Sequence, residues 1–299
     1  MDEIGIGLIG AGFMGKAHAI AFHSAGIVFP LKTRPRPEIL ADADDRLAAA
    51  AARALGFPRS TGDWRSLVGD PAVSVVDITA PNSLHKPMAL AAIAAGKHVY
   101  CEKPLAPSAG EALAMAEAAE RAGVRTMVGF NYLKNPVVTL ARDIIAAGEL
   151  GEIIDFRGIH AEDYMADPAA PFTWRLEGGP GAGALADLGS HIIALARFLL
   201  GPIAAVFGTL ETVVERRPAS ATDPTSRAVR ADDQARMLVR FARGTGGSIT
   251  ASWVATGRKM QLAFEVTGTK GSLAFTQERL NELRLYAAGQ PHGREGYKT

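Results

Sequence analysis

The strongest constraint on the fold is the alternation of short apolar runs with alanine-rich segments over the first 129 residues. The apolar runs predict strands at residues 4–9, 38–41, 73–79, 98–101 and 125–129, and the segments between them predict helices at 13–25, 44–55, 83–95 and 108–122. Strands that alternate with helices form parallel βαβ units, and strands as apolar as these fit a sheet covered on both faces. We therefore expect a doubly wound α/β domain over residues 1–129.

The pattern changes after residue 129. Helices are predicted at 136–147 and 187–200, with a strand at 153–158 and a glycine-rich loop at 178–183 between them. Farther on, alternate residues are apolar through 234–241, 249–253 and 262–266, and a glycine turn at 268–271 precedes a last strand. A period of two with one apolar face predicts a large, mostly antiparallel, open sheet. We expect a second domain, of the α+β class, over residues 130–299.

Composition excludes several classes of function. The chain has 299 residues, with 32 Lys and Arg against 31 Asp and Glu, a balance that gives no large field for nucleic acid or acidic membranes. Its one cysteine, Cys101, excludes an internal disulfide and fits a reducing compartment. The acidic start is unlike a signal peptide, and no run reaches about 18 apolar residues. We expect a cytoplasmic protein with neither nucleic-acid nor membrane partners, and no spacing of ligands predicts a metal site.

A glycine motif, Gly10-Ala11-Gly12-Phe13-Met14-Gly15, lies between the first predicted strand and the first predicted helix. In a G-x-G-x-x-G turn the first glycine permits the bend, the second lets the backbone approach a pyrophosphate, and the third lets the helix pack on the strand. The N–H groups at the start of the helix would bind the phosphates. We predict a dinucleotide site here, with Phe13 and Met14 among its residues.

An acid after the second strand would bind the adenosine ribose, and Asp42 is our candidate. It lies 32 positions after Gly10, more than the usual interval of about 20, and we attribute the surplus to an inserted loop at 29–37. A carboxylate there repels a 2′-phosphate and favours NAD, although capping of the next helix is an alternative role. The loop also carries three basic side chains that leave NADP open, namely Lys32, Arg34 and Arg36.

Further motifs extend along most of the chain. The glycine motif continues into Lys16-Ala17-His18, and the others are Thr79-Ala80-Pro81-Asn82-Ser83-Leu84-His85, Glu102-Lys103-Pro104-Leu105, Trp174-Arg175 and Gly183-Ala184-Leu185-Ala186-Asp187-Leu188-Gly189-Ser190-His191. With these motifs the sequence resembles the Gfo/Idh/MocA family of oxidoreductases. The resemblance implies a Rossmann domain that binds NAD or NADP, followed by a domain for substrate binding and oligomerisation. Within the family, the residues from Asn131 to Tyr164 are similar to those of bacterial sugar and cyclitol dehydrogenases.

The chemistry of three residues agrees with this resemblance. Lys103 follows the carboxyl end of a parallel strand, where such sheets bind ligands, and its ammonium can stabilise alkoxide character. Asp187 and His191 are four apart and share one face if helical, and the pKa of histidine suits a reversible proton acceptor. We assign His191 as general base, Lys103 as the group that polarises the alkoxide, and Asp187 as a ligand of the substrate hydroxyl. The family leaves open whether lysine or histidine takes the proton, and a surface lysine or a core histidine is the structural alternative.

Other residues complete the predicted site. The cofactor would also contact Ala80, Asn82, His85, Glu102, Trp174 and Arg175, and the substrate would contact Asn131, Tyr132, His160, Asp163 and Tyr164 besides Asp187 and His191. Each has a structural alternative as a cap or core residue. Cys101 is expected to be buried and unreactive.

The leading hypothesis is an NAD(P)-dependent dehydrogenase that oxidises a sugar, an anhydrosugar or a cyclitol. An NAD-dependent glycosidase or a non-catalytic, dinucleotide-sensing regulator are the alternatives, and a homo-oligomer, dimer or tetramer, is expected. Two departures from the family leave the substrate open: Ala194 stands where many relatives carry an acid, and residues 131–134 replace an arginine-bearing segment. The chain also ends at Thr299, earlier than most relatives, which leads us to expect that a C-terminal segment is missing.

Overall fold

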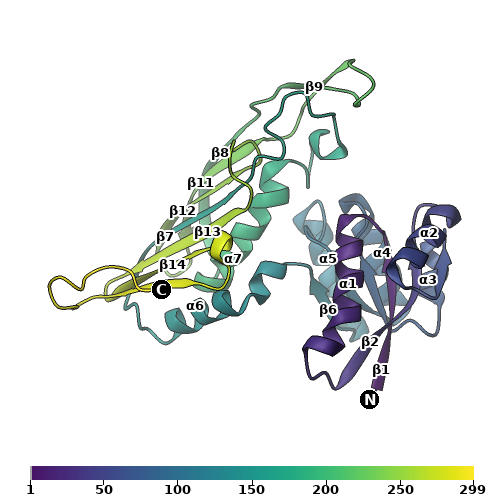
Figure 1. Cartoon of the computed structure of the whole chain (residues 1–299), viewed down its shortest axis with the longest axis horizontal. Helices are drawn as coiled ribbons and strands as arrows, with labels where there is room; N and C mark the ends of the chain where they lie inside the picture. Colours follow the sequence, from purple (N-terminus) through teal and green to yellow (C-terminus); the bar gives the residue numbers. More distant parts are fainter. Residues whose placement is uncertain (1) are drawn as a thin grey trace. The chain divides into compact units, whose positions relative to one another are not determined.

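The computed structural model describes residues 2–299 and forms two compact units, Met1–Gly129 and Phe130–Thr299 (Figure 1). In the first unit the described residues form a six-stranded parallel sheet in the order β3-β2-β1-β4-β5-β6. Its strands are β1 (Asp2–Ile9), β2 (Thr33–Ala41), β3 (Arg59–Thr61), β4 (Val75–Ile78), β5 (His98–Cys101) and β6 (Thr126–Val128). Its helices are α1 (Phe13–Val28), α2 (Asp45–Leu55), α3 (Trp64–Gly69), α4 (Asn82–Ala94) and α5 (Ala109–Ala122). The expected doubly wound α/β domain is confirmed.

Two separate cores explain why these strands are apolar along their whole length. Leu8 and Leu40 pack with Ala19 of α1 and with α2, whereas Ile9 packs in a different cluster with Met88 of α4 and with α3 and α5. Because successive side chains of a strand point to opposite faces, adjacent residues of β1 contribute to the two cores.

The second strand is longer than its sequence indicated. We expected a loop at 29–37 and a strand at 38–41. The prediction was wrong for residues 33–37, because β2 begins at Thr33 and pairs with β1 from its first residue. The proline-rich start of this segment hid the strand. Pro35 and Pro37 lie where β2 has only β1 as a neighbour, since pairing with β3 begins at Ile39. Proline is tolerated at such an edge because no partner strand needs its missing N–H.

The second unit contains a seven-stranded sheet in the order β15-β14-β13-β7-β12-β11-β8 within residues 130–299. Its strands are β7 (Ile153–Ala161), β8 (Ile203–Glu211), β11 (Gln234–Phe241), β12 (Gly246–Ser252), β13 (Gln261–Gly268), β14 (Gly271–Thr276) and β15 (Leu283–Ala287). Their pairing is antiparallel except between β7 and β12, which confirms the mostly antiparallel sheet. Two short strands, β9 (Arg216–Pro218) and β10 (Ser226–Ala228), form a separate hairpin.

Helices cover one face of this sheet. α6 (Pro136–Ala146) and α7 (Ser190–Leu200) pack on it through a core that includes Ile192, Leu195 and Phe156, and Figure 1 shows both along the sheet. Short helical turns complete the unit: η1 (Asn131–Lys134), η2 (Trp174–Leu176), η3 (Leu185–Gly189) and η4 (Gln277–Arg279). Along β11, Val239 and Phe241 are buried whereas Leu238 is 62 % exposed, as the period of two predicts.

The helix predicted at 187–200 is present, but its first residues form a π-helical turn and not an α-helix. The segment η3 is a π-helical turn that runs directly into α7, so Asp187 lies in π geometry and His191 in the first turn of the α-helix. Single π turns inside helices are frequent at functional sites.

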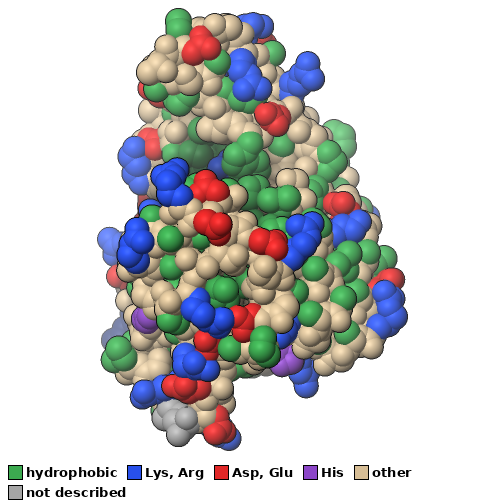
Figure 2. Space-filling model, turned by 90° about the vertical axis from the view of Figure 1, so that its right-hand side faces the viewer, with side chains coloured by type: hydrophobic (Ala, Val, Ile, Leu, Met, Phe, Trp, Pro, Cys, Tyr) green, Lys and Arg blue, Asp and Glu red, His purple; other side chains and the backbone are tan. Residues whose placement is uncertain are grey.

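Of the helices formed by residues 2–299, none combines the length and apolar composition that a membrane span needs. Basic and acidic side chains are interspersed over the face shown in Figure 2.

Candidate active site

The glycine turn is built by close backbone packing. Gly10 has a φ of +95°, which favours glycine, and a Cβ at Gly15 would lie 2.1 Å from the carbonyl oxygen of Gly10. The hydroxyl of Thr79, just after β4, donates to that carbonyl at 2.7 Å and fixes the turn. At Gly12, by contrast, no heavy atom of residues 2–299 would lie within 4 Å of an added Cβ, and no described side chain caps the helix there. The start of α1 therefore fits a dinucleotide pyrophosphate.

Asp42 stands beside this turn, as predicted for an acid that binds the ribose. One carboxylate oxygen, Oδ2, accepts the N–H of Ala11 at 3.0 Å, and the other, Oδ1, accepts the N–H of Ala43 at 2.7 Å. The helix α2 is capped instead by Asp44, which accepts from Leu47. The capping alternative for Asp42 therefore does not apply.

The basic residues that left NADP open lie at the opposite end of the sheet. Arg34 and Arg36 are in the first half of β2, and Lys32 precedes the strand. At about 3.3 Å per residue, the Cα of Arg36 is about 20 Å from that of Asp42. Arg36 also forms ion pairs with Glu3 and Glu38. The possibility that these side chains reach a 2′-phosphate beside Asp42 was wrong, because the segment is a strand and not a loop.

The turn that carries Lys103 follows β5 and contains a cis peptide bond between Lys103 and Pro104. Glu102 is buried, and its Oε2 accepts the backbone N–H of Lys103 at 3.1 Å. Its Oε1 lies 3.1 Å from the Nε2 of His18 on α1. A Cβ at Gly129 would lie 2.3 Å from this same oxygen, so a side chain there would displace the carboxylate from its present position.

His85 holds the turn from another side. This side chain of α4 is fully buried, with Nδ1 2.9 Å from the carbonyl oxygen of Pro104 and Nε2 2.9 Å from that of Ala80. Asn82 is the first residue of α4. The predicted cofactor residues of the first unit thus gather after β1, β2, β4 and β5, at the edge where parallel sheets bind ligands.

In the second unit, Asp187 and His191 lie among polar and aromatic side chains. The hydroxyl of Tyr164 donates to Oδ2 of Asp187 at 2.7 Å, and Nε of Arg175 lies 3.5 Å from the same oxygen. The ring of His191 is buried and contacts the rings of Tyr132 and His160, with centroids 4.8 and 5.5 Å apart. Burial, with the nearby carboxylates of Glu162 and Asp187, raises the pKa of Tyr132.

Sequence reasoning missed Glu162. Its Oε1 lies 3.2 Å from Nε2 of His160, whose Nδ1 is 3.0 Å from the carbonyl oxygen of Leu188. His160 is 1 % exposed, so both of its ring nitrogens are held inside the protein. The signal was present: residues two apart at the end of a strand share a face, and His160 and Glu162 have that spacing.

The remaining predicted residues lie in different surroundings. Asp163 binds Nζ of Lys259 at 2.8 Å and accepts the N–H of Gly257 at 2.9 Å, and its contact with Lys259 lowers its pKa. Asn131 begins η1 and is exposed. On η2, Trp174 is 43 % exposed and the guanidinium of Arg175 lies 4.5 Å from the centroid of its ring. The structure thus groups Tyr132, His160, Tyr164, Arg175, Asp187 and His191.

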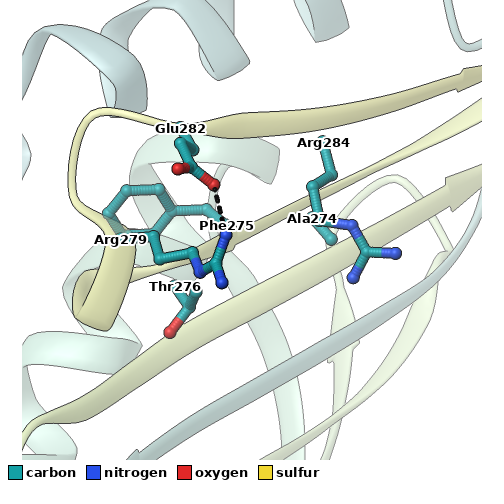
Figure 3. Close-up of a pocket in the computed structure, with 6 residues that line it drawn as sticks. All are labelled: Ala274, Phe275, Thr276, Arg279, Glu282 and Arg284. Atoms are coloured by element: carbon teal, nitrogen blue, oxygen red, sulfur yellow. Dashed lines mark hydrogen bonds and ion pairs between the residues drawn. The ribbon is translucent and has the colours of Figure 1, made fainter. Parts of the chain in front are cut away.

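A pocket elsewhere in the second unit has a different composition (Figure 3). Its lining residues are Ala274, Phe275, Thr276, Arg279, Glu282 and Arg284. They come from β14, η4, β15 and the turn before β15 that holds Glu282, and an exposed ion pair joins Arg279 to Glu282 at 3.3 Å. The predicted site residues belong to other elements, so we do not assign this pocket to the active site. Within residues 2–299 no three His, Cys, Asp or Glu side chains are grouped as metal ligands would be.

Comparison with known proteins identifies both units. Residues 4–130 match the oxidoreductase family with an NAD-binding Rossmann fold, and residues 138–274 match the GFO/IDH/MocA C-terminal domain. Levoglucosan dehydrogenase of Pseudarthrobacter phenanthrenivorans is 41 % identical over 312 residues, which cover 100 % of this chain and 80 % of that protein.

Solved structures agree with the sequence comparison. A levoglucosan dehydrogenase in complex with NADH and levoglucosan is 42 % identical with a TM-score of 0.94, covering 99 % of this chain and 79 % of that one. An NAD-binding oxidoreductase from Klebsiella pneumoniae is 48 % identical with a TM-score of 0.94 and the same coverage. The family resemblance and the NAD cofactor expected from the sequence are thereby confirmed. The chain belongs to the GFO/IDH/MocA family of NAD-binding oxidoreductases.

Proposed function

We propose that this protein oxidises a secondary hydroxyl of a sugar, an anhydrosugar or a cyclitol, with NAD as the acceptor of the hydride. The observation that carries the proposal is the group around Asp187 and His191. A carboxylate held by Tyr164 and Arg175 lies near a buried imidazole packed against Tyr132 and His160. Hydroxyl, carboxylate and aromatic groups together suit the polar edges and apolar faces of a sugar ring. The similarity to levoglucosan dehydrogenases favours an anhydrosugar within this class.

Three side chains have distinct roles in the proposal. His191 accepts the hydroxyl proton, because an imidazole takes up and releases protons near neutral pH. The ammonium of Lys103 stabilises negative charge on the substrate oxygen, and Asp187 accepts a hydrogen bond from a substrate hydroxyl. Bound NAD supplies the hydride acceptor, and Gly10, Gly12 and Gly15 are the residues that would hold its pyrophosphate. We also keep Trp174 among the residues proposed to contact the cofactor.

Asp42 supports a preference for NAD over NADP. Its carboxylate lies beside the glycine turn, where the adenosine ribose is bound in this type of fold, and a 2′-phosphate would be repelled. The basic side chains of β2 are too far away to offset that repulsion. Activity with the two cofactors at equal concentration tests this point, and a clear preference for NADP would contradict it.

The main test measures NADH formation by absorbance over a panel of anhydrosugars, aldoses, inositols and aryl glycosides. We expect NADH with at least one polyol class. Release of aglycone without net NADH would instead identify a glycosidase. Binding of NAD with no turnover of any compound would leave a regulator and would contradict the proposed oxidation.

We also propose that the protein is a homo-oligomer, dimer or tetramer, that associates through β8 and β11. Phe207 of β8 is paired with Leu238 of β11, and these side chains are 73 % and 62 % exposed. β8 is the last strand in the described sheet order, so a second copy of the chain can cover both its edge and this apolar face.

We also propose that the protein is cytoplasmic, since its one cysteine is a buried free thiol, as expected in a reducing compartment.

Light scattering coupled to gel filtration tests the assembly. The double substitution Phe207→Glu with Leu238→Glu should yield monomers. Ile27→Glu is the matched control, because Ile27 is an exposed apolar residue of the first unit, and it should leave the mass unchanged. A wild-type protein that is monomeric at micromolar concentration would contradict the proposal.

A further inference from the structure

His18 belongs to the motif that continues the glycine turn, yet the chemistry proposed above gives it no role. Its side chain extends from α1 into the sheet, where it is 7 % exposed. The Nδ1 atom lies 2.8 Å from Oδ2 of Asp77 on β4, and the Nε2 atom lies 3.1 Å from Oε1 of Glu102 after β5. Three elements that are distant in the sequence therefore meet at one imidazole.

Both ring nitrogens of His18 face carboxylate oxygens, and this decides its protonation. Carboxylates accept hydrogen bonds, so both contacts are satisfied together when both nitrogens carry a proton. The ring of Tyr100 stacks on the imidazole, with centroids 4.9 Å apart and planes at 4°. Burial alone would lower the pKa of His18, but the hydrogen bonds to Asp77 and Glu102 outweigh it and raise the pKa to about 9. At neutral pH, His18 is therefore an imidazolium.

Glu102 transmits this contact to the turn that carries Lys103. One of its oxygens is held by His18, and the other accepts the backbone N–H of Lys103. The absence of a side chain at Gly129 leaves room for Glu102 in this position. Because two anchors fix the carboxylate, the backbone of Lys103 is located relative to α1 and to the glycine turn at the start of that helix.

We propose that His18 is a positioning residue for the reaction, which acts through Glu102 to fix the turn of Lys103 relative to the glycine turn. This inference rests on the proposed function, since it concerns the residue that stabilises the substrate oxygen. A displaced ammonium loses much of its effect on a transition state, because electrostatic stabilisation depends on preorganised geometry.

Two isosteric substitutions separate the two contacts of His18. The amide nitrogen of Gln reaches the position of Nε2, so His18→Gln keeps the bond to Glu102 and loses the one to Asp77. The amide nitrogen of Asn reaches the position of Nδ1, so His18→Asn does the reverse. We expect kcat to fall about 10- to 100-fold in His18→Asn but less than about fivefold in His18→Gln, with KM for the substrate little changed in both. Equal loss in the two variants would show a merely structural role and overturn the proposal.

The pH dependence gives a second readout. Above pH 9, His18 loses one ring proton. The contact of Nε2 with Glu102 is the longer one, 3.1 Å against 2.8 Å for Nδ1 with Asp77, so we expect Nε2 to lose the proton and the bond to Glu102 to weaken. Wild-type kcat should then decline, whereas His18→Gln should lack this decline. The other titratable groups around the ring are Asp77 on β4 and Tyr100, Cys101 and Glu102 on and after β5. Burial raises the pKa of Tyr100 to about 12 and raises that of Cys101 as well, so neither thiol nor phenol titrates near pH 9. An identical alkaline decline in wild type and His18→Gln would contradict the inference.

Two measurements need no substrate and so distinguish failure of this inference from failure of the proposed function. Hydrogen exchange of the peptide covering residues 101–106 should accelerate in His18→Asn and stay near wild type in His18→Gln. In ¹⁵N spectra of labelled histidine, His18 should keep both ring protons up to about pH 9. His23→Gln is the matched control, because His23 is exposed on the same helix and contacts only the carbonyl of Leu55 in the described hydrogen bonds. Unchanged exchange in His18→Asn would overturn the inference even if the enzyme is active.

Discussion

Each unit holds a buried histidine, and the surroundings of the two differ. In the first unit, His18 is enclosed between two acidic side chains and stacked on Tyr100, an arrangement that keeps it charged. In the second, His191 packs against the rings of Tyr132 and His160 at the start of a helix that follows a π turn. The difference teaches that two carboxylates beside a buried imidazole favour a fixed charge, whereas His191, which we propose as the proton acceptor, is surrounded mainly by aromatic rings.

Removing the proposed proton acceptor should have the largest effect. His191→Ala should lower kcat by about 10²- to 10⁴-fold, because general-base catalysis contributes on that order. Lys103→Met should act similarly by removing the charge that stabilises the substrate oxygen. Steady-state kinetics with the substrate found in the panel measure both, and thermal unfolding checks that the variants fold. Near-wild-type turnover in either variant would remove that residue from the mechanism.

Cofactor choice tests the carboxylate beside the glycine turn. Asp42→Ser should shift the ratio of kcat/KM for NAD to that for NADP by about 10- to 100-fold toward NADP, since the repulsion of a 2′-phosphate is lost. Asp44→Ser is a matched control, because Asp44 caps α2 and a serine can still cap it. A similar shift in both variants would show that Asp42 does not act on the ribose.

The fixed charge of His18 should appear in stability. Its pKa is raised above the unfolded value of about 6.5, so its contribution is fully present below that pH and is lost as the pH rises through about 9. The contribution of His18 to the free energy of unfolding should therefore fall by about 3 kcal/mol between pH 6 and pH 10. In His18→Gln this fall should be reduced. Urea unfolding at the two pH values measures it, and an equal fall in the variant would assign it to other groups.

A substitution of Tyr164 tests whether its hydrogen bond to Asp187 contributes to catalysis. Tyr164→Phe removes the hydroxyl that donates to Asp187, and we expect kcat/KM to fall about fivefold, which corresponds to one partly exposed hydrogen bond of about 1 kcal/mol. Kinetics of this variant beside Tyr286→Phe provide the comparison, because Tyr286 lies on β15 far along the chain. No difference between the two would show that the hydrogen bond from Tyr164 does not determine how Asp187 acts.

The smallest effect is expected from the basic residues of β2. Arg34→Ala should change kcat/KM for NADP by less than about twofold, because Arg34 lies eight residues of extended strand, about 26 Å, from Asp42. The same kinetics measure it. A marked loss with NADP would mean that the phosphate binds elsewhere than beside Asp42.

Local sequence patterns were sufficient to predict which residues of the first unit lie together at the candidate cofactor site. The glycine turn, Asp42 and the Lys103 turn follow strands in sequence, and parallel strands bring their carboxyl ends to one edge, so spacing alone predicts their grouping. The proline-rich start of β2 misled us because a proline is acceptable wherever no neighbouring strand needs its N–H, and sequence does not reveal which edge is free. Glu162 was missed because the strand was predicted to end at residue 158, whereas β7 continues to Ala161, so the spacing of two between His160 and Glu162 was not interpreted as that of a strand.

The sequence by itself determined the alternation of strands and helices in the first unit, the dinucleotide motif, the family and the residue types available for the reaction, since these follow from local spacing and from hydrophobic period. It did not predict the short elements β3 and α3 or the strand β8. Only the tertiary structure decided which partners each polar group has. His18 and Asp77 are 59 positions apart, and Arg175 reaches Asp187 from a different turn. Such contacts arise from the packing of distant elements around a common core, and the pKa of His18 depends on that packing and not on its neighbours in the chain.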